Sequence, residues 1–479
     1  VAAYVVGVLV TLFAAYRPAR RAARVAPVAA LRDDQAMPER SLKVRAVAGA
    51  VLAAVGVAGL VAGGLDVADD AGTSASLVGV GSLALLVAAI VLSPVLARPF
   101  VRLVGAVLPR LSGPAGKLAR DNALRNPRRT AATASALMVG ATLVTAFSII
   151  GASANASIGS TVDETLNADF IVSTSVGQPF TAAIAEEMRS VDGVKSVGES
   201  RLGAAQLDGK VATFMAADEA TLADGMQLDV VDGRMTGGLL VDTATAKSRG
   251  WHVGNVVQAV GVDGTELALP LAGTFNSNPA TGPIVMPLAD LDRLGGEKLD
   301  RWVFLRLADG ADADEVRASA EKVLADYPVV TVKDRAEFTQ EQQASVGQIL
   351  LLINAMLVLS VLIAVLGIVD TLALSVMERT REVGLLRAVG MSRRQLKRAV
   401  RLEAVLIALF GAVLGLGLGL TFGISLVSVM KTQGIEELAV PGVRLAGLVV
   451  IAGVVGVLAA VWPARRAARM PVLEAIATT

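Results

Sequence analysis

The chain has 479 residues, of which 54% are hydrophobic and 18% are charged, and its net charge at pH 7 is +1. Soluble domains carry about 25% charged residues, so this composition excludes an ordinary soluble protein and indicates a membrane protein with one water-soluble part. The near-zero net charge gives no field that favours nucleic acid, the lack of cysteine excludes thiol catalysis, and the single histidine, His252, excludes a histidine-based metal cluster.

Seven apolar runs follow one another along the chain, and each is interpreted as a membrane span because about 20 apolar residues cross a bilayer. The runs cover residues 1–16, 44–64, 77–97, 130–152, 347–376, 401–429 and 443–462. The first run is short, and we expect that the sequence begins inside a longer reading frame. The sixth run has a glycine at every fourth position, which predicts a helix face that another helix approaches closely. These glycines are Gly411, Gly415, Gly419 and Gly423.

Basic residues are concentrated in alternate loops. The segments 17–45, 98–129 and 377–401 are rich in Arg and Lys, whereas the segment 65–76 carries aspartates and no basic residue. Because cytoplasmic loops carry the excess of Lys and Arg, the three basic segments are predicted to lie inside the cell. This orientation places the C-terminus in the cytoplasm and residues 153–346 outside the membrane.

Residues 153–346 are predicted to form one large extracytoplasmic α+β domain. Its two ends, 170–197 and 302–332, each read as a strand, an acidic amphipathic helix and a second strand. Two such units predict a split βαβ platform, with a smaller β-rich lobe formed by the inserted residues 205–295. The predicted fold class is therefore an α-helical membrane protein with about seven transmembrane helices and this one outer domain.

The segment 377–391 lies between the fifth and sixth runs and reads Met-Glu-Arg-Thr-Arg-Glu-Val-Gly-Leu-Leu-Arg-Ala-Val-Gly-Met. As a helix it places Val383, Leu386 and either Val389 or Gly390 on one apolar stripe.

The same segment predicts charge pairs at i,i+3 spacing, Glu378 with Arg381 and Arg379 with Glu382. A short amphipathic helix under a membrane is either a lipid-facing anchor or a handle for a cytoplasmic partner. The pattern alone leaves both interpretations open.

Near the two ends of the chain the same heptapeptide, Pro-Ala-Arg-Arg-Ala-Ala-Arg, occurs at residues 18–24 and 463–469. Each copy follows an apolar run and is followed by a Pro-Val pair. A repeat in the same context indicates a duplicated membrane module. We therefore expect one whole module together with the tail of another.

The segment 378–390 resembles the cytoplasmic loop of the FtsX-like permeases of ABC transporters, a family that includes the MacB and LolC/LolE types. Residues 119–130 resemble the amphipathic helix that leads into the first span of that module, and residues 237–254 resemble part of its outer domain. The resemblance implies that the loop is a coupling helix docking on an ATPase subunit. The coupling residues that fit are Glu378, Arg379, Arg381, Glu382, Gly384, Leu385, Leu386, Arg387, Ala388 and Gly390.

The resemblance also implies a division of the chain into five parts. Residues 1–33 match the last span and cytoplasmic tail of an incomplete first module, and 34–113 match a two-helix transmembrane linker. Residues 114–152 match the amphipathic helix and first span of a complete module, 153–346 its extracytoplasmic domain, and 347–479 its permease domain with three spans and the coupling helix 377–391.

A permease subunit in the bacterial cell membrane is the function that this resemblance implies, with no catalytic, cofactor or metal site of its own. The sequence has no Gly-x-x-x-x-Gly-Lys-Ser/Thr loop, so ATP hydrolysis is expected from a separate, homodimeric ATPase subunit. The other expected partners are membrane lipids and a second permease chain or an extracytoplasmic protein, and nucleic acid is not expected.

Two functions follow from that architecture. In the first, the outer domain exports or extracts a lipid, a lipoprotein or a peptide. In the second, the same machinery is a signalling or regulatory device acting on a peptide sensor or a cell-wall hydrolase. A membrane-anchored binding domain without any ATPase is disfavoured, because an anchor needs no coupling helix.

Overall fold

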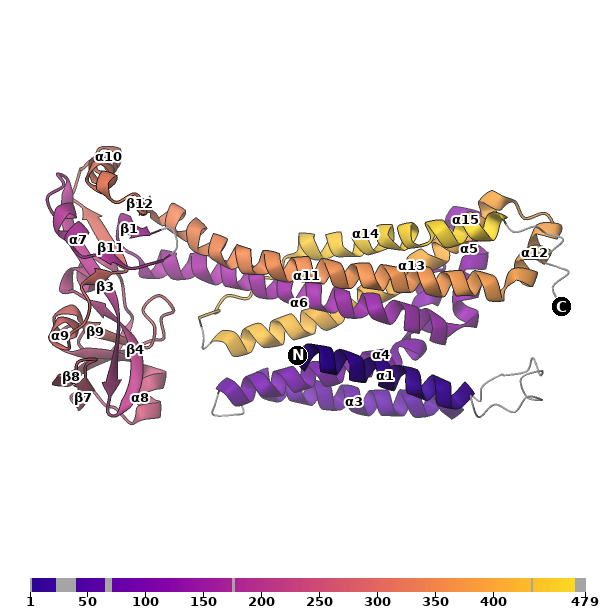
Figure 1. Cartoon of the computed structure of the whole chain (residues 1–479), viewed down its shortest axis with the longest axis horizontal. Helices are drawn as coiled ribbons and strands as arrows, with labels where there is room; N and C mark the ends of the chain where they lie inside the picture. The colour runs from indigo at the N-terminus through magenta and orange to yellow at the C-terminus, as the bar shows by residue number, and fades with distance from the viewer. Residues whose placement is uncertain (1, 23–39, 65–70, 175–176, 432–433, 470–479) are drawn as a thin grey trace.

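The computed structural model describes residues 2–22, 40–64, 71–174, 177–431 and 434–469, and shows a bundle of long helices with an α/β domain at one end (Figure 1). We call residues 166–334 the outer domain and the opposite end of the bundle the inner end. Among the described residues, six helices are long and apolar enough to cross a membrane. They are Lys43–Gly64, Gly72–Val104, Pro127–Thr165, Arg335–Glu378, Arg393–Met430 and Gly442–Arg469.

These six helices contain the second to the seventh of the predicted apolar runs. The first run lies in α1 (Ala2–Ala22), which is helical but is not one of the six, so the seventh span remains a prediction. The fold class is confirmed in its coarser form, as a multi-pass helical membrane protein with one large α/β domain. The division into a first-module tail, a linker pair and a complete module also remains a prediction.

Two helices, α6 (Pro127–Thr165) and α11 (Arg335–Glu378), run side by side from the inner end into the outer domain (Figure 1). We call this pair the stalk. With 39 and 44 residues they are about 59 and about 66 Å long at 1.5 Å per residue, roughly twice the hydrocarbon thickness of a bilayer. Each therefore crosses the membrane and continues beyond it without a break.

The outer ends of the stalk helices are fixed by hydrogen bonds. Asp334 accepts a bond from the backbone N–H of Glu337 at 2.7 Å, and the Glu337 carboxylate accepts one from the Asp334 N–H at 3.0 Å, so α11 starts in a capping box. Arg335 donates to the Leu166 carbonyl, next to the end of α6, at 3.1 Å. The outer domain is thereby joined to both helices with no flexible linker between them.

The predicted glycine face belongs to α13 (Arg393–Met430) and packs against α6. A Cβ at Gly415 would lie 2.5 Å from the Met138 carbonyl oxygen, and one at Gly411 would lie 2.6 Å from that of Ala134. The glycines therefore allow the two helix backbones to touch, which confirms the prediction and identifies the partner helix.

The other membrane helices surround this pair. α3 (Arg40–Gly64) packs along α4 (Ala71–Val104), and α14 (Gly442–Ala459) packs on α13. At the inner end lie α5 (Leu108–Arg125), α12 (Thr380–Ala388) and α15 (Val461–Arg469) (Figure 1).

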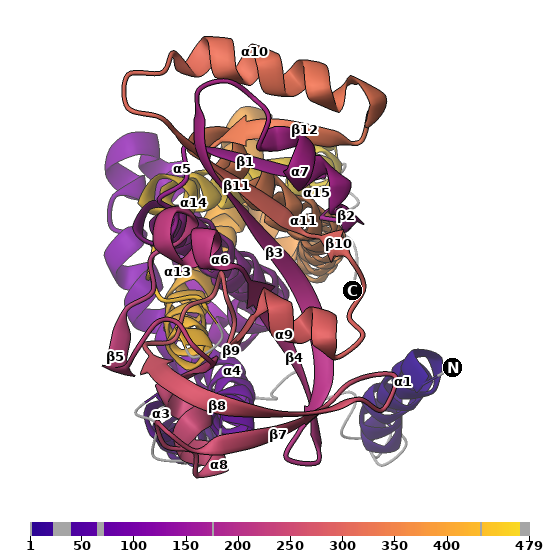
Figure 2. The same ribbon diagram turned by 90° about the vertical axis from the view of Figure 1, so that its left-hand side faces the viewer.

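The outer domain contains the predicted platform. Its strands lie in the antiparallel order β12-β1-β11-β3, with α7 following β1 and α10 following β11, which makes two β-α-β units (Figure 2). The bounds are β1 Phe170–Thr174, α7 Ala183–Met188, β3 Val194–Leu207, β11 Trp302–Leu307, α10 Ala313–Val323 and β12 Val330–Asp334. The split βαβ prediction is confirmed.

The inserted lobe continues the same sheet. Beyond β3 the order is β4-β9-β6-β8-β5, with β7 pairing both β3 and β8. The bounds are β4 Lys210–Ala217, β5 Val230–Gly233, β6 Leu239–Asp242, α8 Thr243–Arg249, β7 Val256–Val260, β8 Glu266–Phe275, β9 Ile284–Pro287 and α9 Leu288–Arg293. Strand β3 passes from the platform into the lobe, so the two parts share one ten-stranded sheet (Figure 2).

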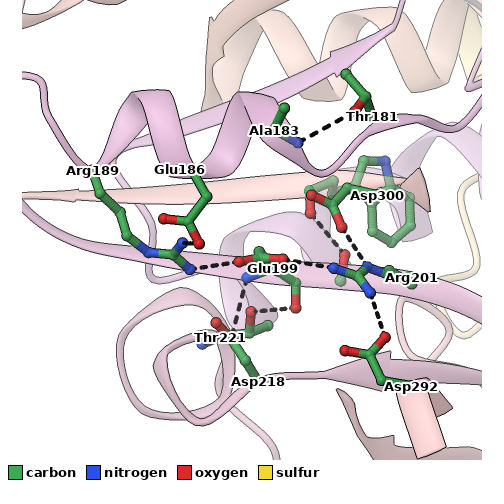
Figure 3. A network of polar contacts seen from close by, with 12 residues as sticks. Thr181, Ala183, Glu186, Arg189, Glu199, Arg201, Asp218, Thr221, Asp292 and Asp300 are labelled. Carbon is green, nitrogen blue, oxygen red and sulfur yellow. Dashed lines mark hydrogen bonds and ion pairs between the residues drawn. The ribbon is translucent and has the colours of Figure 1, made fainter. Parts of the chain in front are cut away.

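A network of charged side chains lies where β3 passes between platform and lobe (Figure 3). Arg201, which is only 4% exposed, donates to Glu199 at 2.9 Å, to Asp292 of α9 at 2.8 Å and to Asp300 of β10 (Leu299–Asp300) at 2.7 Å. Glu199 also accepts a bond from Arg189, next to α7, at 2.5 Å. Platform and lobe are therefore held together by directed bonds, which favour one relative arrangement over others.

The buried Asp300 carboxyl makes the stability of the outer domain depend on pH. Burial raises its pKa from 3.8 to about 6, against the opposing hydrogen bond from Arg201. The folded state therefore binds the proton more tightly than the unfolded state. The stability gained by protonation is fully present below pH 3.8 and is lost as the pH rises through 6.

We expect the wild type to gain about 1 kcal/mol of unfolding free energy relative to Asp300→Asn when the pH is lowered from 7.5 to 5. Thermal unfolding of the two full-length proteins, followed by tryptophan fluorescence at each pH, measures this difference. The asparagine variant is the reference for every other titrating group. A relative loss of wild-type stability on acidification would contradict the prediction and show Asp300 ionised against Arg201.

Candidate functional site

The predicted coupling helix 377–391 is divided in the structure. Helix α11 continues to Glu378, Arg379 leaves the helical conformation with φ −102° and ψ 21°, and α12 occupies only Thr380–Ala388. Gly390 then adopts φ +110°, a value that a residue with a side chain rarely takes, and the chain turns into α13. The prediction of one continuous helix was therefore wrong, and α12 is a short helix between two bends.

The apolar side chains of this segment face two ways. Val383 packs inward against a cluster formed by α11, α13 and α15, and Gly384 is buried. Leu385 is 49% exposed, Leu386 36% and Val389 89%. The predicted stripe of Val383, Leu386 and Val389 is thus not a single face, because α12 ends before Val389.

The predicted charge pairs are replaced by a contact between helices. Because Arg379 interrupts the helix, the i,i+3 geometry is lost, and the Glu378 carboxylate lies 3.0 Å from the Arg129 guanidinium of α6. Arg129 also donates to the Thr371 carbonyl of α11 at 3.2 Å. The inner ends of the two stalk helices are therefore joined by Arg129, beside the first bend of the coupling segment.

The remaining predicted residues lie on α12 itself. Arg381 and Glu382 are exposed in its first turns, and Arg387 is half-buried in its last turn. A carboxylate near the N-terminus and a guanidinium near the C-terminus both complement the helix dipole. This arrangement stabilises a helix that is otherwise short.

A pocket of about 360 Å³ opens between α12 and the helices behind it. Glu382, Leu385 and Leu386 line one side. On the other side Asn122 of α5 donates to the Glu403 carboxylate of α13 at 3.2 Å. The exposed residues of α12 thus form the rim of a recess and not a flat face.

Sequence reasoning did not identify Asn122, Arg129 or Glu403 as part of this site. A signal was present for two of them, since Arg129 and Glu403 are charged residues near the inner ends of long apolar helices, whereas Asn122 lies in the amphipathic α5. Their pairing joins positions more than 240 residues apart, which no local pattern reveals. Within the described part of the chain, no group of three or more His, Cys, Asp or Glu could hold a metal ion.

The second copy of the heptapeptide forms part of α15. Its Pro463, Ala464, Ala467 and Ala468 are buried, whereas Arg465, Arg466 and Arg469 are exposed. The Arg466 guanidinium lies 5.5 Å from the centre of the Trp462 ring. The small residues of the motif therefore pack against the bundle while its arginines face the solvent. Part of the first copy lies outside the described residues, so the duplication remains a prediction.

Two known protein families match parts of the chain. The FtsX-like permease C-terminal family matches residues 354–472, and the MacB-like periplasmic core domain matches residues 130–323. The first match covers α12 and the helices on either side of it. The second covers α6 and most of the outer domain.

Individual relatives are similar to this chain over shorter stretches. The macrolide export ATP-binding/permease protein MacB of Bordetella avium is 29% identical over 190 residues, which are 39% of this chain and 29% of that protein. The pyoverdine export ATP-binding/permease protein PvdT of Pseudomonas fluorescens is 27% identical over 190 residues, 38% of this chain and 28% of the relative. The chain thus spans less than a third of the length of these relatives.

Among solved structures, the periplasmic region of MacB from Actinobacillus actinomycetemcomitans matches with a TM-score of 0.28 and 11% identity, over 36% of this chain and 92% of that one. The two family matches are separated by residues 324–353, and together they include most of α6 and of the outer domain, the inner half of α11, α12 and the last two spans. The chain therefore carries an FtsX-like permease C-terminal domain and a MacB-like periplasmic core domain.

Proposed function

We propose that this chain is the permease subunit of an ABC transporter, and that α12 is the element that docks on a separate, homodimeric ATPase subunit. ATP-driven closure of that subunit pushes on α12, and the stalk carries the movement to the outer domain. The outer domain then exports or extracts a lipid, a lipoprotein or a peptide at the outer face of the membrane.

The observation that carries this proposal is the exposure of α12. Leu385 and Leu386 of α12, and Val389 directly after it, present apolar side chains at the inner end, beside the exposed charges of Arg381 and Glu382. Apolar side chains grouped on such a surface mark a protein or membrane contact. The charges on the same short helix favour a protein partner.

The stalk supports the mechanical part of the proposal. α11 runs from the bend beside α12 to strand β12 without interruption, and Arg129 joins α6 to it at that bend. Transmission between distant sites requires a rigid element with two arrangements that both sites bias. Two antiparallel helices that lie side by side and are fixed to each other at both ends satisfy the first requirement.

In the proposed orientation, α12, the C-terminus and the basic segments face the cytoplasm, and the outer domain faces the other side of the bacterial cell membrane. The relatives named above are described as export proteins, which favours transport over the regulatory alternative. Further partners, a second permease chain or an extracytoplasmic protein, belong to this proposal as well.

The pair between Arg129 and Glu378 provides the first test. Both side chains are partly exposed, so the pair contributes no more than about 1 kcal/mol to stability, and Arg129→Gln should leave folding and membrane insertion intact. We expect the variant to bind its partner ATPase but to lose more than half of the stimulation of ATP turnover. Co-purification and the rate of ATP turnover measure the two effects separately.

The matched comparison is a double-mutant cycle with Glu378→Gln. If the residues act through their bond, the double variant loses no more stimulation than Arg129→Gln alone. If the losses of stimulation in the two single variants add up in the double variant, the residues act independently. The ion pair between Arg129 and Glu378 would then not transmit the movement. Failure of the wild-type chain to bind the ATPase would instead overturn the docking assignment.

A further inference from the structure

A second pocket at the inner end, of about 590 Å³, lies on the other side of α13. Its charged lining comes from Arg394, Lys397, Arg398 and Arg401, and no carboxylate contributes to it. These positions recur at three- and four-residue spacing, so they share one face of the helix. We call this the basic pocket.

The cations of the basic pocket have no ion-pair partner in the part of the chain that the structure describes. Among the described residues, none of the four forms an ion pair, and the buried Nε of Arg401 has no hydrogen-bond partner. Lys397 and Arg401 are half-buried, whereas Arg394 and Arg398 are exposed at the rim. Four converging like charges without a counterion repel one another, and a bound anion removes that repulsion.

The surroundings identify the kind of anion. Leu402 and Val405 of α13 and Val457 of α14 form the apolar side of the pocket. From Val457 an exposed apolar row continues along α14 through Val454 and Val450, which are 53% and 67% exposed. The i, i+4 and i+7 spacing places these three valines on one face, which leads away from the cations along a membrane-spanning helix.

Trp462 marks the level of the pocket in the membrane. It is 54% exposed and lies shortly after the end of α14. In membrane proteins, amphipathic tryptophans sit at the boundary between acyl chains and water. Basic pockets between membrane helices at such a boundary suit phosphate-bearing headgroups. A free phosphate would contact the cations but would make no contact with the apolar row.

We propose that the basic pocket binds the phosphate of an anionic phospholipid, with the acyl chains lying along Val457, Val454 and Val450. The headgroup contacts Lys397 and Arg401, and the rim arginines close around it. The site goes beyond the proposed transport function and does not depend on an ATPase.

The position of the basic pocket links the bound lipid to the proposed transport function. The first turns of α13 separate the two pockets, with Lys397 and Arg401 on one side and Leu396, Val400 and Glu403 facing α12 on the other. A bound lipid therefore supports the helix directly behind the docking segment.

The test measures binding of a short-chain fluorescent phosphatidylglycerol to the purified full-length chain in a neutral detergent, at a fixed salt concentration. A basic residue near an anionic headgroup is worth about fivefold in affinity, so Lys397→Gln/Arg401→Gln should weaken binding about 25-fold. Phosphatidylcholine of the same chain length should not compete, and neither should inorganic phosphate at the same concentration.

The matched control is Arg98→Gln/Arg102→Gln, which removes the same charge from exposed positions at the inner end of α4. It should leave the affinity unchanged. Equal weakening by both double variants would mean diffuse attraction to a basic membrane face and would overturn the pocket. Competition by inorganic phosphate as strong as that by the lipid would overturn the lipid assignment.

A second double variant, in the exposed arginines at the rim, keeps the test decisive if the first one misfolds. Arg394→Gln/Arg398→Gln alters two exposed side chains in the first turns of α13, and removal of positive charge near a helix N-terminus does not destabilise the helix. It should weaken phosphatidylglycerol binding while the elution volume and thermal unfolding stay those of the wild type. Unchanged affinity in this variant would count against the proposal.

Discussion

Replacement of Leu386 by aspartate is expected to abolish stimulation of the partner ATPase and to prevent co-purification of the two proteins. Leu386 is 36% exposed at the rim of the recess behind α12, so its side chain is available to a partner while the fold does not depend on it. A central apolar anchor of an interface costs about 2 kcal/mol or more when it is removed, roughly a 30-fold loss of affinity. A carboxylate adds the cost of burying an unpaired charge.

The control for this substitution is Leu111→Asp. Leu111 lies in α5 at the same end of the bundle and is 74% exposed, but it does not line the recess. The same chemical change there should leave ATPase binding and turnover at wild-type values. If Leu386→Asp binds and stimulates the ATPase normally, α12 is not the docking element, and the lipid-facing interpretation of this helix takes its place.

Substitution of Gly415 by valine is expected to have the largest effect on stability. A Cβ at Gly415 would lie 2.5 Å from the Met138 carbonyl oxygen and 2.6 Å from the Ala141 Cβ, both on α6. These atoms are backbone or directly attached to it, so they cannot move aside as the end of a long side chain can. Overpacking of this kind costs about 1–3 kcal/mol, and more where backbones must separate.

The neighbouring Gly417 supplies a matched control. Apart from its chain neighbours and the backbone of its own helix, no atom of the described residues lies within 4 Å of the Cβ position there, although the helix is the same and the position is only two residues away. Gly417→Val should therefore unfold close to the wild-type temperature in the same detergent, while Gly415→Val unfolds well below it. Equal destabilisation would show that the helix itself, and not its contact with α6, requires glycine.

The membrane helices and the platform could be predicted because their signals are local. Apolar runs define spans wherever they occur, and glycines at every fourth position share a helix face whatever packs against it. The identity of that partner was not predictable, since α6 and α13 lie far apart in the sequence. The helical character of six predicted spans, the glycine face and the two β-α-β units are confirmed.

The long strand β3 shows why the lobe was harder to predict. Its central residues include Glu199 and Arg201, whose charges interrupt the alternation that identifies a strand. Arg201 is tolerated because Asp292 and Asp300, 91 and 99 residues later, accept its hydrogen bonds in the fold. Glu199 is tolerated because it accepts hydrogen bonds from Arg189 and Arg201. A strand whose charged residues depend on such distant partners has a weak local signal in the sequence.

The prediction of one continuous helix over 377–391 was wrong for a similar reason. Its sequence reads as one helix, but the break at Arg379 accompanies the bond between Glu378 and Arg129 on another helix. The arginines of the basic pocket were predicted only as markers of orientation. Their spacing places them on one face of α13, but that this face opens beside Val457 of α14 depends on how the two helices pack.

The length of the stalk sets the scale of any movement in this molecule. A straight rod about 66 Å long that pivots at its inner end by ten degrees displaces its far tip by about 11 Å. Because the helices of the stalk continue well past the membrane before they reach the sheet, a rotation too small to disturb the packing of the spans is magnified at the outer domain. The molecule can thus act as a lever, whose stroke is fixed by the number of helical turns between pivot and tip.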